Sequence, residues 1–86
     1  MLDKKTLAAS AAVLAQNKLA VAASNVLGNE CLSKGQYHEA IQHYSSAIGF
    51  NSTDNVFYYN RGDCYLQIRS FPCAIADARK VSIAST

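Results

Sequence analysis

The residues from Gly28 to Ile48 set a pattern that returns thirty-four positions further along the chain. The matched pairs are Gly28 and Gly62, Leu32 and Leu66, Tyr37 and Phe71, Ala40 and Ala74, and Ile41 and Ile75. A constant period of tens of residues indicates a solenoid, in which each unit is one supersecondary element that buries its apolar face by stacking on its neighbours. The chain is therefore predicted to be a short stack of similar units.

Composition limits the classes of partner that such a stack could have. Half of the 86 residues are apolar and 16% are charged, so the chain is too hydrophobic to be disordered throughout. The eight basic and six acidic side chains give a formal net charge of +2 and are spread along the sequence. A nucleic-acid-binding surface needs a concentration of basic residues, and no such block is present, so we expect no nucleic-acid partner.

Three cysteines, Cys31, Cys64 and Cys73, form no CxxC pair and are odd in number. This pattern suits a reducing compartment and argues against a disulfide framework or a structural zinc site. We expect a protein of the cytoplasm, with the nucleus as an alternative, and we expect no cofactor.

Residues 1–20 are predicted to be a polar start followed by an Ala-rich helix. From Thr6 to Leu27 the chain contains no Gly or Pro and is dominated by Ala and Leu, which have the best helix propensities. This helix either covers the end of the stack or continues into the first helix of the first unit. A third alternative is a surface for self-association, because Ala-rich helices can approach each other closely.

The same segment raises the question of targeting. Its apolar run is interrupted by polar residues and is shorter than the roughly 20 residues that a membrane span needs, so we expect no membrane partner. A mitochondrial transit peptide remains an alternative, because no acid occurs between Asp3 and Glu30. Against it, no arginine precedes Arg61.

Residues 21–54 are predicted to form the first unit. Its first helix ends near Ser33, and Gly35 closes the last turn, since glycine takes the left-handed conformation readily. The apolar spacings place one face of each helix inward. The inward residues are Val21, Ser24, Leu27, Gly28 and Cys31 on the first helix and Tyr37, Ala40, Ile41, Tyr44, Ala47 and Ile48 on the second, with Phe50 as a further anchor.

Residues 55–86 are predicted to form a second, incomplete unit, whose second helix starts at Pro72. Its inward residues are Tyr58, Gly62, Tyr65, Leu66, Ala74, Ile75, Ala78 and Val81. No polar closing helix follows within the 86 residues, although terminal repeats need one to cover their last apolar face. We expect either a longer array or a partner that covers this open end, including a second copy of the chain.

These residues closely resemble the tetratricopeptide repeat family, whose unit is a thirty-four-residue helix-turn-helix. The resemblance covers about residues 21–86. It is carried by Leu27, Gly28, Gly35, Tyr37, Ala40, Tyr44 and Ala47 in the first unit and by Tyr58, Gly62, Tyr65, Phe71 and Ala74 in the second. It implies an all-α solenoid of two helix-turn-helix repeats preceded by the Ala-rich helix.

The sequence departs from the family's pattern at five positions. In the first unit, Ser24 replaces an early aromatic and Ser52 replaces a proline. In the second unit, Arg61 replaces an aliphatic, Arg69 the glycine between the helices, and Ala78 an aromatic. The second unit is therefore the less regular of the two.

The resemblance implies a non-enzymatic protein-interaction module, an adaptor or a scaffold. In this family the first helices of successive units line a concave groove that binds peptide segments. By the family's register, Ala22 and Val26 face this groove together with the candidate site residues. Those candidates are Asn25, Asn29, Leu32, Ser33, Val56, Tyr59, Asn60, Asp63 and Gln67.

A more specific alternative is the binding of the acidic C-terminal tails of heat-shock chaperones. Some family members grip such a tail with two asparagines and three basic residues, a carboxylate clamp, and Asn29 and Asn60 match the asparagines. The first lysine of the clamp is Asn25 here, and the other two basic residues would lie on a third repeat. Asp63 would repel a carboxylate at a cost of about 1 kcal/mol. Another peptide or protein partner is therefore the first expectation.

An enzyme is the contrasting class. Its best candidates are His38 and His43, but a spacing of five separates two side chains on a helix by about 140°, so both rings cannot readily bind one metal ion. The three cysteines have no histidine or acid at a recurring catalytic spacing. We therefore expect no catalytic residue and no metal site.

Overall fold

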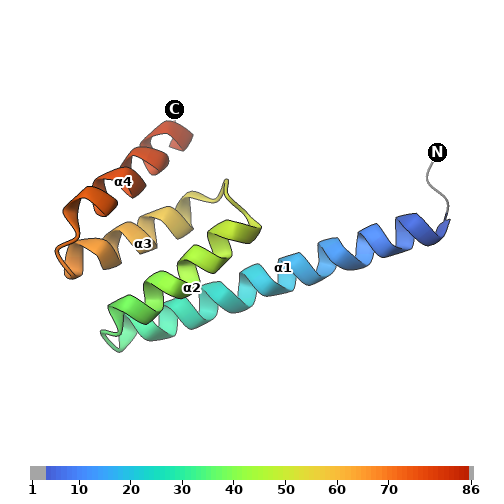
Figure 1. Ribbon diagram of the computed structural model, residues 1–86, viewed down its shortest axis with the longest axis horizontal. Coiled ribbons are helices and arrows are strands. Elements are labelled where there is room, and N and C mark those ends of the chain that lie inside the picture. The colour runs from blue at the N-terminus through green and yellow to red at the C-terminus, as the bar shows by residue number, and fades with distance from the viewer. Residues whose placement is uncertain (1–3, 86) are drawn as a thin grey trace.

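The computed structural model describes residues 4–85, with side chains described over 12–81, so the first residues of the predicted polar start lie outside it. Four helices follow one another: α1 (Lys4–Ser33), α2 (Tyr37–Phe50), α3 (Asn55–Gln67) and α4 (Phe71–Ser85). Within residues 4–85 there is no strand. Helix α2 packs against both α1 and α3, and α4 packs against α3, so consecutive helices form one row (Figure 1). The predicted all-α repeat fold is confirmed.

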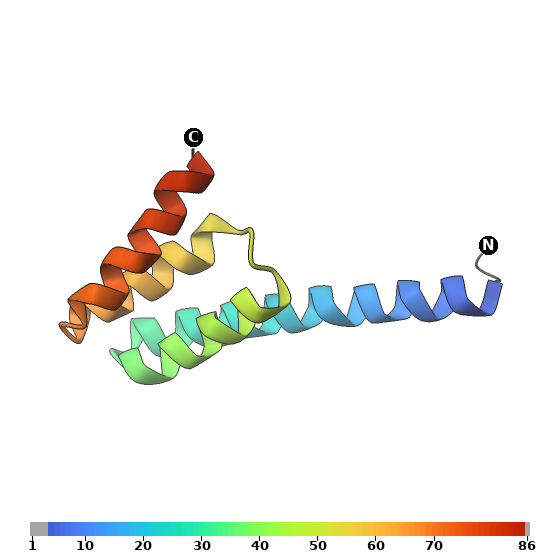
Figure 2. The same cartoon turned by 45° about the horizontal axis from the view of Figure 1, so that its top comes forward.

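The Ala-rich helix and the first helix of the first unit are one continuous helix. Helix α1 has 30 residues and passes the predicted boundary at residues 20 and 21 without a break. Its sequence offers no Gly or Pro before Gly28 at which it could end. The N-terminal half of α1 therefore extends past the end of α2, which both views show (Figures 1 and 2).

The first unit turns at Gly35, as the sequence predicts. Gly35 has a φ of 74°, and the next residue, Gln36, donates its backbone N–H to the carbonyl of Cys31 at 2.8 Å. This pattern is a Schellman motif, which uses a left-handed residue to satisfy the last carbonyls of a helix. It reverses the chain so that α2 runs back along α1.

The second unit makes the same turn without glycine. Arg69 has a φ of 64°, and Ser70 donates its N–H to the carbonyl of Tyr65 at 2.8 Å. A left-handed conformation costs a side-chain-bearing residue about 1–2 kcal/mol. The second unit therefore keeps the geometry of the first in spite of a local strain at Arg69.

The centre of the core lies where α1, α2 and α3 meet. Ala40, Tyr44 and Cys64 are wholly buried there, and the partly buried residues packed against them are Cys31, Leu32, Tyr37 and Ile41. Gly28 lies directly under the Tyr44 ring, since a Cβ on Gly28 would stand 2.7 Å from Tyr44 Cε1. The small residue predicted at this helix crossing is therefore required by an aromatic ring rather than by backbone contact alone.

A second buried contact joins α3 to α4. Asp77 is only 3% exposed, and Arg61 binds both of its carboxylate oxygens, with Nε at 2.9 Å from Oδ2 and Nη2 at 2.7 Å from Oδ1. Arg61 also donates from Nη1 to Ser45 Oγ on α2 at 3.1 Å. A buried carboxylate without a partner is strongly destabilising, so Arg61 and Asp77 depend on each other. The departure of Arg61 from the family's aliphatic thus has a structural reason that sequence reasoning missed.

Several residues predicted to face inward are exposed. On the second unit they are Leu66, Ile75 and Ala78, which lie on the side that faces away from α2. On α1, Leu27 is exposed, and its equivalent one repeat later is Arg61, which reaches α2. In a repeat stack, these positions are covered by a neighbouring unit. Among the described residues, each of the two units has a neighbour on one side only.

Phe50 is likewise half-exposed instead of anchoring the core. Conversely, Phe57 and Cys64 on α3 are buried, although neither was assigned to an inward face from the sequence. Both belong to the helix that covers the first unit, so their burial follows from stacking between units.

The contact between Gly28 and Tyr44 leads to a prediction about stability. In the variant Gly28→Ala, the new Cβ must displace a ring that is fully buried and hydrogen-bonded, and such overpacking costs about 1–3 kcal/mol. Gly49→Ala is the matched control, because nothing lies within 4 Å of a Cβ added to Gly49 on α2. This control is expected to stabilise the helix by about 1 kcal/mol. Thermal melts of both variants test this, and a Gly28→Ala protein that melts as high as Gly49→Ala would contradict the packing.

Candidate functional site

The residues predicted to line the groove lie on α1 and α3. Both helices contribute to the core cluster, in which Cys64 of α3 is buried and against which Cys31 and Leu32 of α1 pack. Of the candidates, Asn29, Ser33, Val56, Tyr59 and Gln67 are exposed, whereas Asn25, Leu32, Asn60 and Asp63 are partly buried. Leu32 contributes to the core as well as to the edge of this surface.

Tyr44 fixes the side chain of Asn29. The Tyr44 hydroxyl on α2 donates a hydrogen bond to Asn29 Oδ1 on α1 at 2.5 Å. A primary amide has one acceptor oxygen and an NH2 group with two donors. Because Tyr44 uses the oxygen of this exposed residue, the donors are the groups that Asn29 presents to a ligand. Sequence reasoning selected Asn29 but did not foresee the tyrosine that orients it.

Asp63 stands close to the same tyrosine. Burial, followed by the nearby Cys64, Cys31 and Asp63, raises the pKa of Tyr44 to about 12. Burial and then the charge of Asp63 raise the pKa of the Cys64 thiol to about 11. The charge of Asp63 therefore acts on the same tyrosine that binds Asn29.

Asn25 occupies one turn of α1 before Asn29. Its Oδ1 atom is buried and has no hydrogen-bond partner among the described residues. Its position is that of the first lysine of the carboxylate clamp, so the groove has a neutral amide where that clamp has a cation. On α3, Val56 and Tyr59 are exposed, and Tyr59, which lies thirty-four positions after Asn25, is 68% exposed.

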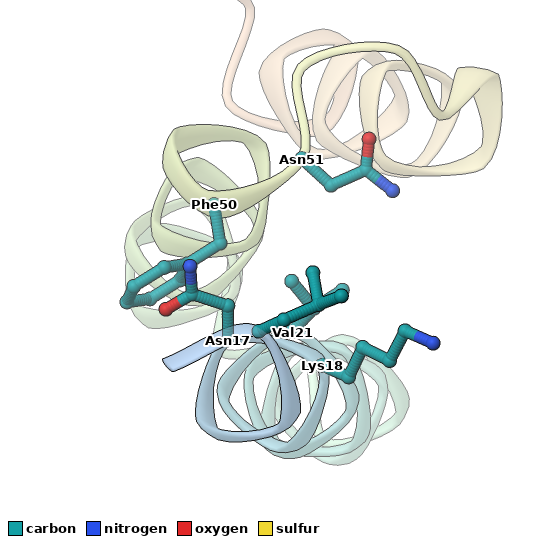
Figure 3. Close-up of a pocket in the computed structure, with 6 residues that line it drawn as sticks. Asn17, Lys18, Val21, Phe50 and Asn51 are labelled. Atoms are coloured by element: carbon teal, nitrogen blue, oxygen red, sulfur yellow. The ribbon is translucent and has the colours of Figure 1, made fainter. Parts of the chain in front are cut away.

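A cleft of about 310 Å³ lies outside the predicted groove, between the N-terminal half of α1 and the end of α2 (Figure 3). It is lined by Leu14, Asn17, Lys18, Val21, Phe50 and Asn51. Figure 3 shows the Phe50 ring beside the amide of Asn17, with Lys18 pointing to the other side. Sequence reasoning assigned Val21 and Phe50 to the core and did not predict a cleft between them.

A second cleft, of about 260 Å³, lies between α3 and α4. Its lining includes two of the candidate site residues, Tyr59 and Asp63. The remaining lining residues are Gly62, Leu66, Ala74, Ile75 and Ala78. We refer to these seven residues as the outer cleft.

Neither metal ligation nor a membrane span is found in the described part of the chain. Among its residues, no three His, Cys, Asp or Glu side chains come together in a way that could hold a metal ion. No helix in the same part is long and apolar enough to cross a bilayer.

Comparison with known proteins identifies the repeat. Residues 28–68 match the sequence model of the TPR repeat family. The chain is 42% identical over 53 residues to the Hsp70-Hsp90 organizing protein of Triticum aestivum and 36% identical over 53 residues to the heat shock protein sti1 homolog of Schizosaccharomyces pombe. Each alignment covers 62% of this chain and 9% of that protein.

A further relative is the human mitochondrial import receptor subunit TOM34, which is 34% identical over 50 residues. That alignment covers 58% of this chain and 16% of TOM34. The chain thus spans only a small part of the length of the curated relatives it matches. No solved structure matches it significantly.

The raised pKa of Cys64 predicts a loss of stability in alkali. In the unfolded chain the thiol ionises near its ordinary pKa of 9.0, whereas in the folded chain it ionises near 11. Between these values the unfolded state has lost a proton that the folded state keeps, so the free energy of unfolding falls as the pH rises above 9. At pH 10.5 the expected loss from Cys64 is about 2 kcal/mol.

Urea unfolding at pH 8 and pH 10.5, under reducing conditions, measures this loss. Cys64→Ala should lose about 2 kcal/mol less than the wild type between the two pH values, and Cys73→Ala, at an exposed cysteine, should lose as much as the wild type. Equal losses in all three proteins would show that Cys64 is not buried as described.

Proposed function

Because residues 28–68 of the chain belong to the tetratricopeptide repeat family, we propose that it is a non-enzymatic protein-interaction module that binds a peptide in the groove of α1 and α3. The module acts as an adaptor or scaffold and supplies no chemistry of its own. The three cysteines are free, which supports a place in the reducing cytoplasm.

The observation that carries this proposal is the hydrogen bond from Tyr44 to Asn29. It holds an exposed amide in one orientation, so its N–H donors meet a ligand without a further loss of side-chain entropy on binding. The backbone carbonyls of an extended peptide accept such bonds. Asn60 on α3 would supply a second amide, and the exposed Val56 and Tyr59 would contact apolar side chains of the peptide.

Chaperone tails are a second candidate, and one observation favours them. The relatives include Hsp70-Hsp90 organizing proteins, whose name states their partners, and the chain retains both asparagines of the carboxylate clamp. The charges of the groove act against this candidate. Asn25 stands where the clamp has its first lysine, and Asp63 adds a negative charge to the residues predicted to line the groove. We infer that this groove by itself favours peptides that place a neutral or basic group near Asp63.

Titration with two short peptides separates the candidates. One peptide ends in an acidic residue, an aliphatic residue and a free carboxylate, and the other has the same sequence with an amidated C-terminus. If the groove binds the peptide backbone through amides alone, the two peptides bind within about threefold of each other. If the carboxylate clamp operates, the free carboxylate binds at least tenfold more tightly, and Asn25→Lys increases that preference.

The groove itself is tested by Asn29→Ala combined with Asn60→Ala. This double variant should lose at least tenfold in affinity for whichever peptide binds, as measured by isothermal titration calorimetry. Gln42→Ala, at an exposed position of α2, is the control and should bind as the wild type does. Unchanged affinity of the double variant would place the peptide elsewhere and refute the proposal.

A further inference from the structure

Lys18, Asn25 and Asn29 stand in one row along α1. Asn25 and Asn29 follow Lys18 by seven and eleven positions on the same helix. Successive residues of an α-helix are about 100° apart, so both asparagines point within about 20° of the direction of Lys18. Between Lys18 and Asn25 the row passes only the small, exposed side chain of Ala22. We refer to Lys18, Asn25 and Asn29 as the donor row.

Each member of the donor row presents N–H groups to a ligand. The Oδ1 atom of Asn29 is bound to the Tyr44 hydroxyl, which leaves the NH2 group of Asn29 for the ligand. Asn25 is partly buried, and its Oδ1 atom is the buried end of the side chain, so its NH2 group is the accessible end. Lys18 is exposed, and an ammonium group has donors and no acceptor. The row therefore offers donors alone, and its complement is a row of acceptors.

The positive charge of Lys18 is not neutralised by its surroundings. The sequence has no acidic residue between Asp3 and Glu30. None of the residues that the structure describes forms an ion pair with Lys18. Its side chain points away from Phe50 (Figure 3). The charge of the donor row thus favours a ligand that brings a carboxylate.

The spacing of the donor row fits an extended segment of chain. A helix rises about 1.5 Å per residue, so Asn25 lies about 6 Å from Asn29 along α1, and Lys18 lies roughly 10 Å further on. In an extended chain, residues that face the same side are about 6.7 Å apart. If one residue of the segment faces Asn29, the second residue along faces Asn25, and the fourth and sixth bracket Lys18.

We propose that Lys18 is a specificity-determining residue of the groove and that the ligand is an extended acidic segment of a partner protein. Backbone carbonyls of this segment accept hydrogen bonds from Asn29 and Asn25, and a side-chain carboxylate further along binds Lys18. The proposal rests on the peptide-binding function proposed above and adds the charge of the ligand. Asp63 lies on α3 and outside the donor row, so an acidic residue at Lys18 is compatible with a neutral or basic residue near Asp63.

Neither a second copy nor a neighbouring repeat supplies this ligand. Between its helices the described chain has only the segments 34–36, 51–54 and 68–70, which are too short to provide six extended residues. A preceding repeat would need a turn thirty-four positions before that at 51–54, at residues 17–20, where α1 is continuous. A following repeat would stack on the outer cleft, at the opposite end of the row of helices from α1 (Figure 1).

Four nine-residue peptides with acetylated and amidated ends test the proposal. They share a background of serine and threonine and carry two glutamates or two glutamines, at the second and fourth or at the sixth and eighth residue, so that both directions of the segment are covered. Resonances of the ¹⁵N-labelled full chain measure affinity. One glutamate peptide should bind about two- to fivefold more tightly than its glutamine counterpart, as expected for an exposed ion pair. It should also shift the side-chain NH2 signals of Asn25 and Asn29.

Variants of the full chain assign the preference to Lys18. Lys18→Gln should remove the preference for glutamate, whereas Lys80→Gln, at an exposed lysine of α4, is the matched control and should keep it. Lys18→Glu should reverse the preference, so that a peptide with lysines in place of the glutamates binds more tightly than the glutamate peptide. Because Lys18 is exposed, thermal melts of these variants should match that of the wild type.

The outcomes separate this proposal from that of the groove. Equal affinity of the glutamate and glutamine peptides, or a preference that survives in Lys18→Gln, would overturn the role of Lys18. The groove would still stand if Asn29→Ala with Asn60→Ala weakened the binding of all four peptides. No binding by any of the peptides would overturn both proposals. Tighter binding of a single-stranded RNA than of the glutamate peptide would assign the donor row to phosphate groups and overturn this one.

Discussion

The burial of Tyr44 is the contact on which the rest of the structure depends. Its ring fills the space between α1 and α2 above Gly28, and Cys64 of α3 packs with it. Its hydroxyl would be a buried polar group without a partner, at a cost of about 1–3 kcal/mol, if Asn29 Oδ1 did not accept its hydrogen bond. One side chain therefore sets the helix crossing of the first unit, packs against α3 of the second unit, and orients the amide of Asn29 at the surface.

The second unit reaches the same arrangement by different contacts. Where the first unit has an exposed leucine at Leu27, the second has Arg61, whose bond to Asp77 joins α3 to α4. The hydrogen bond to Asp77 raises the pKa of Arg61 in spite of the opposing effect of burial, so the guanidinium stays charged. Arg69 takes the left-handed backbone conformation that Gly35 takes in the first unit. The backbone repeat is preserved, while the chemistry inside and around it has changed.

The sequence alone was sufficient for the helices, the turn at Gly35 and the small residues at the crossings, because each depends on local spacing within one period. It failed where burial depends on a neighbour. Leu66 and Ile75 match the buried pattern but are half-exposed in the structure. Asp77 has the sequence pattern of a surface acid, although it is buried beside Arg61. Asn29 was selected by register, whereas its orientation depends on Tyr44, fifteen residues away on another helix.

The most direct measurement is a set of nuclear Overhauser effects from the Tyr44 ring in the folded chain. The structure requires strong contacts from the ring protons to the α-protons of Gly28 and to protons of Cys64, which lie on two different helices. Their joint presence would establish that one aromatic side chain unites α1, α2 and α3. A Tyr44 ring that contacts neither residue, or that flips freely in solvent, would contradict the account from the core outward.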